Sequence, residues 1–354
     1  MPSVTIPSRI RAAVTREFST KTYVTDSYPL KSPADLEPGE CIVKLEYAGV
    51  CHTDLHFMAG EWAIKPRLPS VGGHEGVGRV IALDSMYSGN VRIGDRVGIK
   101  YCVRSCLNCD HCRRGFEQNC PNRIISGYHV DGTFAEYMVA FTDHLIPIPD
   151  GLDSAAAAPI LCAGLTVYNS LSQLNTHVGG WIVIPGAGGG LGHLAIQYAI
   201  ARGLRVLAID SGPKRELCLS LGAEAFIDFT ECTDIVSAVQ AAVSDPMGAH
   251  AALIIAPSNE AYIHAGWYVR PQGTILCIGS PQEVTGLPMA RIIDAGLNII
   301  ATQTGGRQVA HEALQLAARG KVQCHYTEYP LEKINDVFEA MIKGRLVGRA
   351  VIKF

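Results

Sequence analysis

The sequence lacks the features that mark several large classes of protein. Its formal net charge of −3 gives no electrostatic reason to bind nucleic acid or an anionic membrane. Its longest apolar stretch, residues 155–168, is interrupted by Pro159 and is too short to span a bilayer. The N-terminal residues contain no apolar segment typical of a secretory signal, and we find no repeat or low-complexity tract. These absences predict a globular, cytoplasmic protein whose partner is a small molecule.

The length of the chain predicts two domains, since 354 residues exceed what one hydrophobic core usually supports. The apolar fraction of 48% is ordinary for a globular enzyme. Twelve cysteines are present, most of them scattered along the chain. In a reducing cytosol such cysteines are expected to be free thiols or metal ligands.

Four cysteines share the compact spacing C-x2-C-x2-C-x7-C, namely Cys106, Cys109, Cys112 and Cys120. Thiolates at these intervals can surround one tetrahedral Zn²⁺. The alternatives are ordinary thiols or two disulfides, and disulfides are disfavoured because no secretory signal is present. Four sulfur ligands leave no open coordination position. The predicted zinc therefore holds a loop in shape and takes no part in catalysis.

Further candidate ligands occur singly. Cys51 opens the run CHTDLH, His74 and Glu75 lie between glycines, and Cys162 follows an alanine-rich segment. Their separations are not those of a compact metal motif, so spacing alone does not join them. Taken singly, Cys162 is more typical of a packed core thiol, and His74 could equally be a turn residue.

Two patterns of secondary structure divide the chain. Residues 40–150 show short apolar strands separated by glycine turns, which predicts a largely β segment. From residue 181 the pattern changes to apolar strand, glycine turn and helix. Strands are predicted at 181–184, 205–210, 225–228, 251–256, 274–278 and 298–302, and helices at 191–202 and 309–318. This alternation predicts a doubly wound parallel sheet, the Rossmann-type α/β fold.

The turn after the first of these strands is rich in glycine. It contains Gly186, Gly188, Gly189, Gly190, Leu191 and Gly192, one residue longer than the standard dinucleotide fingerprint. A flexible turn is the alternative, but a strand precedes the glycines and a helix follows them. Asp210 ends the second strand, where a carboxylate binds the adenosine ribose and repels a 2′-phosphate. The pattern favours NAD over NADP. Lys214 and Arg215 do not exclude NADP, but a solvated helix start is the favoured role for both.

Several segments together resemble the zinc-dependent medium-chain alcohol dehydrogenases, most closely the short, microbial, tetrameric branch. The resemblance runs from about residue 40 to the C-terminus, through the strings CHTDLH, VGGHEGVGRV, PILCAGLTVY, GAGGGLGHLA, IDFT and LVGRAVI. It implies a split, mostly β catalytic domain of GroES-like type. Residues 1–163 would form this domain with both zinc sites, 164–302 the NAD-binding domain, and 303–354 a return to the catalytic domain. A homo-oligomer, a tetramer by resemblance, is also implied.

The same resemblance assigns roles to individual residues. It implies that Cys51, His74 and Cys162 bind a catalytic zinc whose fourth position is open. The Thr53 hydroxyl would pass the alcohol proton through the nicotinamide ribose to His56, and helix-start residues with no relay role are the alternative for both. Asp54 would orient His74, and Glu75 would approach the metal during ligand exchange. Cofactor contacts are implied for His52, Ser280 and Arg349; a plain surface charge is the alternative for Arg349. Trp62 and Tyr101 would line the substrate pocket.

The resemblance leads to a zinc- and NAD-dependent alcohol dehydrogenase acting on primary alcohols or their aldehydes. Tyr101 stands where tryptophan is usual in the ethanol-active branch, and Ser280 where a larger apolar residue is common, which favours a roomier, more polar pocket. Three alternatives are an NADP(H)-dependent aldehyde reductase, a zinc-free quinone or enoyl reductase of the same superfamily, and a metal-bound redox sensor. The sensor would use the spare thiols of Cys102, Cys218, Cys232, Cys277 and Cys324.

Overall fold

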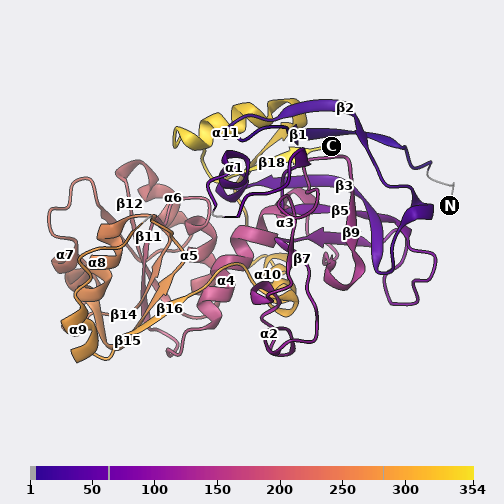
Figure 1. The fold of residues 1–354 in the computed structure, drawn as a ribbon. Coiled ribbons are helices and arrows are strands. Elements are labelled where there is room, and N and C mark those ends of the chain that lie inside the picture. Colours follow the sequence, from indigo (N-terminus) through magenta and orange to yellow (C-terminus); the bar gives the residue numbers. More distant parts are fainter. Residues whose placement is uncertain (1–4, 63, 282) are drawn as a thin grey trace. The chain divides into compact units, whose positions relative to one another are not determined.

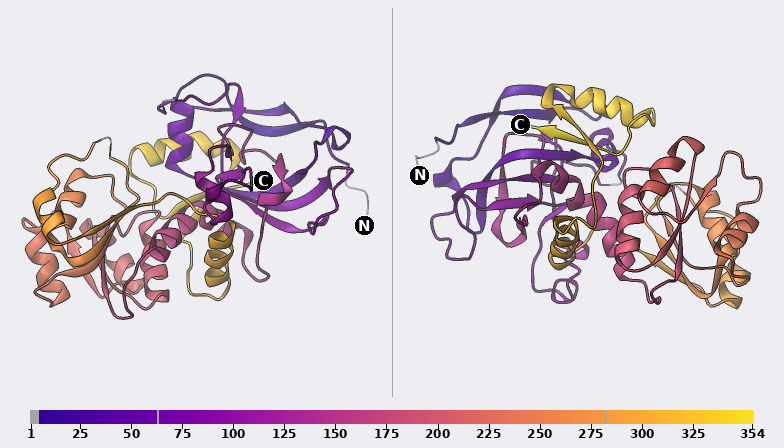
Figure 2. Two further views of the ribbon diagram at one scale, coloured as in Figure 1. Left: turned by 60° about the horizontal axis from the view of Figure 1, so that its bottom comes forward. Right: turned by 180° about the vertical axis from the view of Figure 1, so that it is seen from behind.

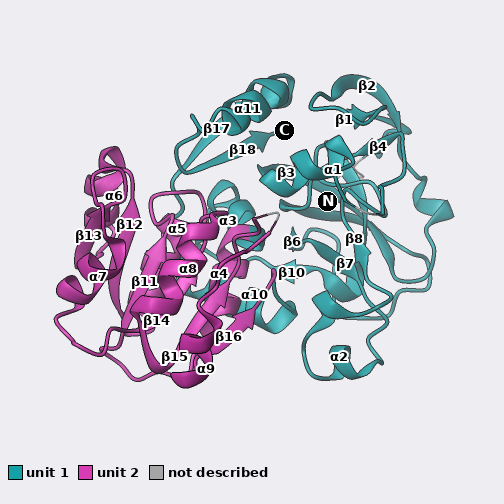
Figure 3. Cartoon of the chain, turned by 60° about the vertical axis from the view of Figure 1, so that its left-hand side comes forward, with its two compact units in different colours: residues 1–162, 305–318, 324–354 teal, residues 163–304, 319–323 magenta. Residues whose placement is uncertain are grey.

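The computed structural model describes residues 5–62, 64–281 and 283–354, and its chain divides into two compact units (Figure 3). Unit 1 comprises Met1–Cys162, Gly305–Ala318 and Cys324–Phe354. Unit 2 comprises Ala163–Thr304 and Arg319–Gln323. Figures 1 and 2 follow the chain from unit 1 into unit 2 and back.

Unit 1 is built mainly from β-strands, as predicted for residues 40–150. A seven-stranded sheet has the order β10-β6-β5-β3-β18-β17, with β9 paired to β3; smaller sheets are β2-β1-β4 and β7-β8. The strands are β1 (Arg9–Thr15), β2 (Tyr23–Pro29), β3 (Glu40–Val50), β4 (Ser70–Val71), β5 (Gly76–Leu83), β6 (Arg96–Ile99), β7 (Cys102–Arg104), β8 (Ile124–Ile125), β9 (Tyr137–Phe141), β10 (Ile146–Pro147), β17 (Tyr326–Pro330) and β18 (Arg349–Lys353).

The helices of unit 1 are short, and two of them contribute to one of the two apolar clusters around these sheets. They are α1 (His52–Ala59), α2 (Asp110–Arg113), α3 (Ser154–Pro159), α10 (Arg307–Ala318) and α11 (Ile334–Ile342). In one cluster Phe338 of α11 packs with Val14 of β1 and Ile352 of β18. The other is centred on Val43 and Val80, from the neighbouring strands β3 and β5. Because β18 pairs antiparallel with β3, the C-terminal segment rejoins the sheet formed early in the chain.

Unit 2 is the predicted doubly wound sheet. Its six strands have the order β13-β12-β11-β14-β15-β16, and every pair is parallel. They are β11 (Trp181–Pro185), β12 (Arg205–Asp210), β13 (Ala225–Asp228), β14 (Ala249–Ile254), β15 (Val269–Cys277) and β16 (Asn298–Ala301). Helices lie on both sides of the sheet (Figure 1): α4 (Leu165–Ser172), α5 (Gly192–Ala201), α6 (Arg215–Ser220), α7 (Ile235–Val243), α8 (Asn259–Tyr268) and α9 (Met289–Asp294). Strand order reverses at β11, the position where such sheets bind ligands.

All six strands of unit 2 were predicted from the sequence, but the prediction for the apolar stretch around Pro159 was wrong in one respect. Pro159 does not end the helix, because a π-helical turn at Ile160–Gly164 continues it into α4. The resulting segment, Ser154–Ser172, has 19 residues and is long and apolar enough for a membrane span by composition alone. The prediction that it is too short was therefore wrong. However, 94% of its most apolar window is buried within the protein, as in a core helix.

Candidate metal centres and cofactor turn

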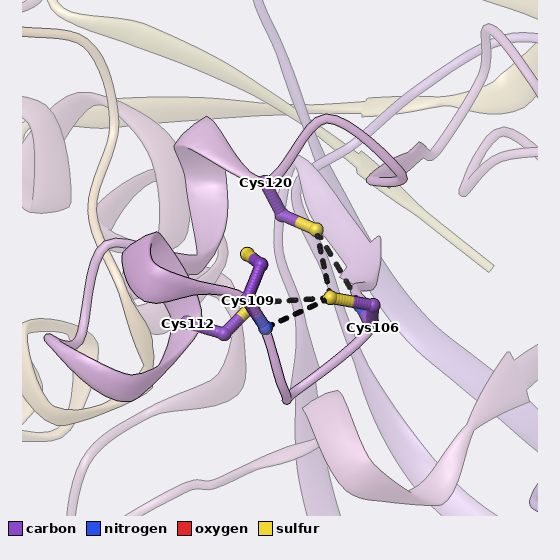
Figure 4. Close-up of side chains that lie close together, drawn as sticks. All are labelled: Cys106, Cys109, Cys112 and Cys120. Atoms are coloured by element: carbon purple, nitrogen blue, oxygen red, sulfur yellow. Dashed lines mark hydrogen bonds between the residues drawn. The ribbon is translucent and has the colours of Figure 1, made fainter.

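The four compactly spaced cysteines converge at one point of unit 1 (Figure 4). Their sulfur atoms all lie within 4.8 Å of one another, with 3.5 Å between Cys106 and Cys120 and 4.0 Å between Cys106 and Cys112. Around Zn²⁺ with Zn–S bonds of about 2.3 Å, sulfur atoms stand about 3.8 Å apart. A disulfide needs a separation of about 2.05 Å. The geometry fits a tetrahedral zinc ion and excludes the disulfide alternative.

The local backbone favours the thiolate form of Cys106. Cys109 is the N-cap of α2, and its N–H donates to Cys106 Sγ at 3.3 Å. Backbone hydrogen bonds from Asn108 and Cys109 lower the pKa of Cys106 to about 6. The loop is also tied to α10, since the buried Glu117 carboxylate pairs with Arg307 at 2.7 Å. The loop therefore presents a charged sulfur to the metal position and is fixed to the core of unit 1.

The separately placed ligands also meet in unit 1. The ligand atoms of Cys51, His74, Glu75 and Cys162 lie within 4.8 Å of one another. Cys51 follows β3 at the start of α1, His74 and Glu75 precede β5, and Cys162 lies in the π-turn after α3. His74 Nε2 is 3.3 Å from Cys162 Sγ, and a hydrogen bond from Cys162 holds the pKa of Cys51 well below its usual value despite burial. The position of Cys162 beside Cys51 and His74 argues against the alternative of a packed core thiol.

This donor set fits a catalytic zinc ion. Two sulfurs and one imidazole nitrogen are ligands that Zn²⁺ prefers, and three protein ligands leave a fourth position for water or substrate. A Cys2His set is already known from the catalytic zinc of alcohol dehydrogenase, so the three residues match an established ligand pattern. Glu75, the fourth member of the cluster, is already paired with Arg349, so the chain holds two candidate zinc sites, one of four sulfurs and one whose zinc ligands would be two sulfurs and an imidazole.

Asp54 orients the imidazole of His74. Its Oδ1 lies 2.8 Å from His74 Nδ1, and its Oδ2 accepts the N–H of Cys51 at 2.9 Å. Since a carboxylate only accepts, Nδ1 carries the hydrogen and Nε2 is left to face the thiols. One buried side chain thus fixes both a ligand's tautomer and the start of α1.

Arg349 is buried, which contradicts the surface-charge alternative. Its side chain forms an ion pair with Glu75, with 2.5 Å between Nη2 and Oε1, and only 5% of the residue is exposed. Burial raises the pKa of Glu75 to about 7, against the opposing charge of Arg349. Glu75 Oε1 lies 3.9 Å from His74 Nε2, close to the ligand atoms. The contact of Arg349 with cofactor phosphate stays a prediction.

Helix α1 carries the residues predicted to move a proton. Thr53 is partly buried and its Oγ1 lies 3.7 Å from Cys51 Sγ, whereas His52 and His56 are exposed. Glu61, which sequence reasoning missed, lies 2.5 Å from His56 Nδ1 through its Oε2. The signal that could have found it is Gly60, a helix stop followed at once by an acidic residue.

An aromatic cluster stands beside the site that contains His74. The Tyr101 ring meets the His74 ring edge-on at 5.7 Å, and Phe57 lies between Tyr101 at 6.4 Å and Trp62 at 4.7 Å. Tyr128 also contacts Phe57, with ring centroids 4.7 Å apart. Sequence reasoning identified Trp62 and Tyr101 but missed the other two aromatics. Phe57 occupies space next to Tyr101. It therefore limits how much pocket volume is gained by having tyrosine and not tryptophan at position 101.

The glycine turn of unit 2 joins β11 to α5 and is held by Asp210. Asp210 Oδ2 accepts the N–H of Gly188 at 2.8 Å, and Lys214 Nζ lies 3.3 Å from Oδ1. A Cβ on Gly192 would stand 2.2 Å from the Gly186 carbonyl oxygen, so only glycine allows this close approach. The carboxylate thus positions the turn from the end of β12.

The remaining predicted cofactor residues of unit 2 lie near this sheet edge. Gly189, Gly190 and Leu191 occupy the same turn, while Ser280 is exposed beyond the carboxyl end of β15. Arg215 stands over the ring of Phe226, with its guanidinium carbon 5.1 Å from the centroid. An ordinary packing role thus already accounts for Arg215.

Comparison with known proteins agrees with the fold and the metal centres. The model of the alcohol dehydrogenase GroES-like domain matches residues 37–150, and that of zinc-binding dehydrogenases matches 190–319. Alcohol dehydrogenase 1 of Neurospora crassa is 40% identical over 354 residues, 99% of each chain. An alcohol dehydrogenase of Geobacillus stearothermophilus is 41% identical over 345 residues, 97% of this chain and 99% of that one. The crystal structure of an NAD-dependent alcohol dehydrogenase superposes with a TM-score of 0.89 at 27% identity, covering 97% of this chain and 99% of that one.

Proposed function

Because the chain belongs to the zinc-dependent medium-chain alcohol dehydrogenase family, we propose that it transfers hydride reversibly between a primary alcohol, or its aldehyde, and NAD(H). The observation that carries this proposal is the convergence of Cys51, His74 and Cys162. A zinc ion held by these three ligands alone would keep a fourth position for the alcohol. A zinc ion held there supplies Lewis-acid polarisation of the alcohol oxygen, and the nicotinamide carries the hydride chemistry.

The chain's own residues handle the proton that alcohol oxidation releases. The Thr53 hydroxyl, 3.7 Å from Cys51 Sγ, accepts the alcohol proton and passes its own onward, through the nicotinamide ribose, to His56. His56 lies one turn further along α1 and is exposed, so it can release the proton to solvent. Asp54 meanwhile holds His74 in the tautomer that binds metal.

Charged residues around the site are proposed to serve ligand exchange and cofactor binding. Glu75, buried beside His74, approaches the metal position when water or product leaves. Arg349 balances the charge of Glu75 and, with His52, contacts the cofactor phosphates. In the proposed domain arrangement, residues 1–163 and 303–354 form the catalytic domain, and 164–302 bind NAD.

Two alternatives lose support. A zinc-free reductase would not need the complete set of three zinc ligands that meet in unit 1. A redox sensor would need accessible, ionised thiols. Burial raises the pKa of both Cys218 and Cys324 to about 12, so these thiols are poorly reactive.

The proposed function is tested by turnover of the purified protein. We expect NADH to form when primary alcohols and NAD are supplied, and we expect a zinc chelator to remove this activity and added Zn²⁺ to restore it. Turnover that survives complete removal of zinc would contradict the proposal.

Cofactor preference should depend on Asp210, whose carboxylate repels a 2′-phosphate while Lys214 lies 3.3 Å away. We propose NAD as the preferred cofactor. Replacing Asp210 with serine removes the repulsion and frees Lys214 to bind the phosphate. We expect the ratio of kcat/KM with NAD to that with NADP to fall by about 10-fold or more, a change of about 1.4 kcal/mol.

Asp228 offers a matched control for this experiment. It ends the neighbouring strand β13 in direct register with Asp210, and its carboxylate binds Thr230. Asp228→Ser should leave the cofactor ratio unchanged. A wild-type preference for NADP, or an equal response of the two variants, would contradict the role of Asp210.

Substrate size should respond to the volume at position 101. We propose that the smaller Tyr101 lets longer primary alcohols compete well with ethanol, while Trp62 still disfavours bulky secondary alcohols. Each newly buried methylene contributes about 0.8 kcal/mol. In Tyr101→Trp, kcat/KM for hexanol relative to ethanol should therefore fall severalfold to roughly 100-fold.

Tyr101→Phe separates size from polarity, because it keeps the ring and removes only the hydroxyl. We expect its ratio of hexanol to ethanol to stay close to that of the wild type. If Tyr101→Trp leaves the ratio unchanged, Phe57 and Tyr128 already set the size of the pocket and the proposal for Tyr101 is wrong.

We propose a homo-oligomer, a tetramer by family likeness, that resides in the cytoplasm. One apolar surface of unit 2 supports association. Its members are Ile299 on the edge strand β16, Trp267 on α8, and Met289 and Ile293 on α9, which are 47–73% exposed; whether they form one continuous surface is part of the proposal. The free thiols of the chain suit a reducing compartment.

A further inference from the structure

Helix α1 ends in a turn that fixes the backbone position of Glu61. Gly60 adopts the left-handed conformation, with φ 65° and ψ 35°. Its N–H donates to the Phe57 carbonyl and that of Glu61 to the His56 carbonyl, each at 3.1 Å, which is the Schellman motif. A Cβ on Gly60 would stand 2.7 Å from the Phe18 ring, so another residue would disturb this turn. The backbone therefore returns Glu61 to the end of α1.

The turn brings the Glu61 side chain onto His56. Glu61 Oε2 lies 2.5 Å from His56 Nδ1, while the Glu61 N–H is bound to the His56 carbonyl. Residues five positions apart do not face each other on a regular helix, so this contact depends on the turn. Glu61 thus contacts His56 through both its backbone and its side chain.

The contact decides which nitrogen of His56 can accept a proton. A carboxylate only accepts hydrogen bonds, so Nδ1 of the neutral ring carries the hydrogen and Nε2 keeps its lone pair. The carboxylate also faces the positive charge that the ring gains when Nε2 takes up a proton. The side chains of His56 and Glu61 are 50% and 58% exposed, so the pair adds little to stability. Its effect is on the ring's orientation and tautomer.

We propose that Glu61 is a positioning residue for proton transfer: it holds His56 with Nε2 as the acceptor. The proposal rests on the proposed alcohol dehydrogenase function, in which His56 receives the alcohol proton through Thr53. In this step the proton released by the alcohol adds to Nε2 of His56, while the Nδ1 hydrogen stays between His56 and Glu61. Solvent then takes one proton from the ring. Another ionisable side chain on the same helix is His52, one turn earlier on α1.

The tautomer can be measured without any turnover. Long-range ¹⁵N–¹H NMR correlations at neutral pH, assigned with a His56→Gln variant, distinguish a ring protonated at Nδ1 from one protonated at Nε2. We expect the Nδ1-protonated form in the wild-type protein and a shift toward the Nε2-protonated form in Glu61→Ala. Glu37→Ala is the charge-matched control, because Glu37 is exposed and its ion pair is with Lys31. Its His56 spectrum should match the wild type.

Kinetics then test whether the tautomer matters. In Glu61→Ala we expect kcat for alcohol oxidation to fall about 10-fold, a fraction of what a general base contributes, with KM for NAD changed less than about 2-fold. In a His56→Gln background the same substitution should have no further effect, because both changes act on one relay. An equal loss in both backgrounds, or an unchanged tautomer in Glu61→Ala, would overturn the proposal. A wild-type protein that oxidises no alcohol would instead contradict the proposed function. The NMR result would still show whether Glu61 sets the tautomer of His56.

Discussion

Replacing Cys162 with serine should abolish alcohol oxidation while leaving one zinc ion per chain. Cys162 Sγ lies 3.3 Å from His74 Nε2 and belongs to the cluster that Cys51, His74 and Glu75 complete. A neutral hydroxyl is a much poorer zinc ligand than a thiolate, so the remaining Cys51 and His74 should not retain the metal. Even residues that only support metal ligands lower activity by about 10- to 100-fold when they are replaced. Loss of a ligand should therefore exceed about 100-fold.

The measurement combines metal analysis with kcat, and Cys232 provides the matched control. Cys232 is a partly buried thiol of unit 2 that belongs to neither metal cluster. The wild-type protein and Cys232→Ser should each carry close to two zinc ions and retain full activity. Cys162→Ser should keep its secondary structure and one zinc ion. A variant that kept two ions, or wild-type activity, would remove Cys162 from the catalytic site.

The two metal centres differ in how far the sequence alone could identify them. The ligands at 106, 109, 112 and 120 are local, so their spacing nearly determines their geometry. Cys51 follows β3, His74 precedes β5 and Cys162 lies in the π-helical turn after α3, so only the folded unit brings them together. Family resemblance had to supply that assignment. The strands of unit 2 were predictable for the opposite reason, since buried parallel strands are continuous apolar runs bounded by turns.

What the sequence could not supply were contacts made by a turn or by side-chain packing. Glu61 reaches His56 only because Gly60 reverses the chain. Phe57 reads as one more apolar residue of a helix, and its position between Tyr101 and Trp62 depends on packing. Arg349 starts a C-terminal strand, and its burial follows from the pairing of β18 with β3. Each of these contacts joins residues whose meeting no local periodicity encodes.

Replacing Cys109 with serine should instead destabilise the protein, because the four-cysteine site is closed and its metal contributes to folding. Structural zinc sites bind with apparent free energies of about 10 kcal/mol or more, much of which is folding free energy. The loop that carries Cys109 is fixed to α10 through the buried Glu117–Arg307 pair, at 2.7 Å, so its loss of order should reach the core of unit 1. We expect the free energy of unfolding to fall by roughly 5 kcal/mol.

Cys109 is the best of the four ligands for this experiment, because it is only partly buried and caps α2, where serine is a favourable N-cap residue. The substitution therefore removes the metal ligand at a position whose backbone suits serine. Asp110→Asn on the same helix is the matched control, since it removes only an exposed pair with Arg114 at 3.5 Å. Scanning calorimetry should show Tm lowered by roughly 10 °C in Cys109→Ser and unchanged in Asp110→Asn. Metal analysis should find about one zinc ion lost in the first variant, because the closed site cannot hold the metal with three sulfurs. A Cys109→Ser protein with wild-type Tm and two zinc ions would show that this loop holds its shape without the fourth sulfur.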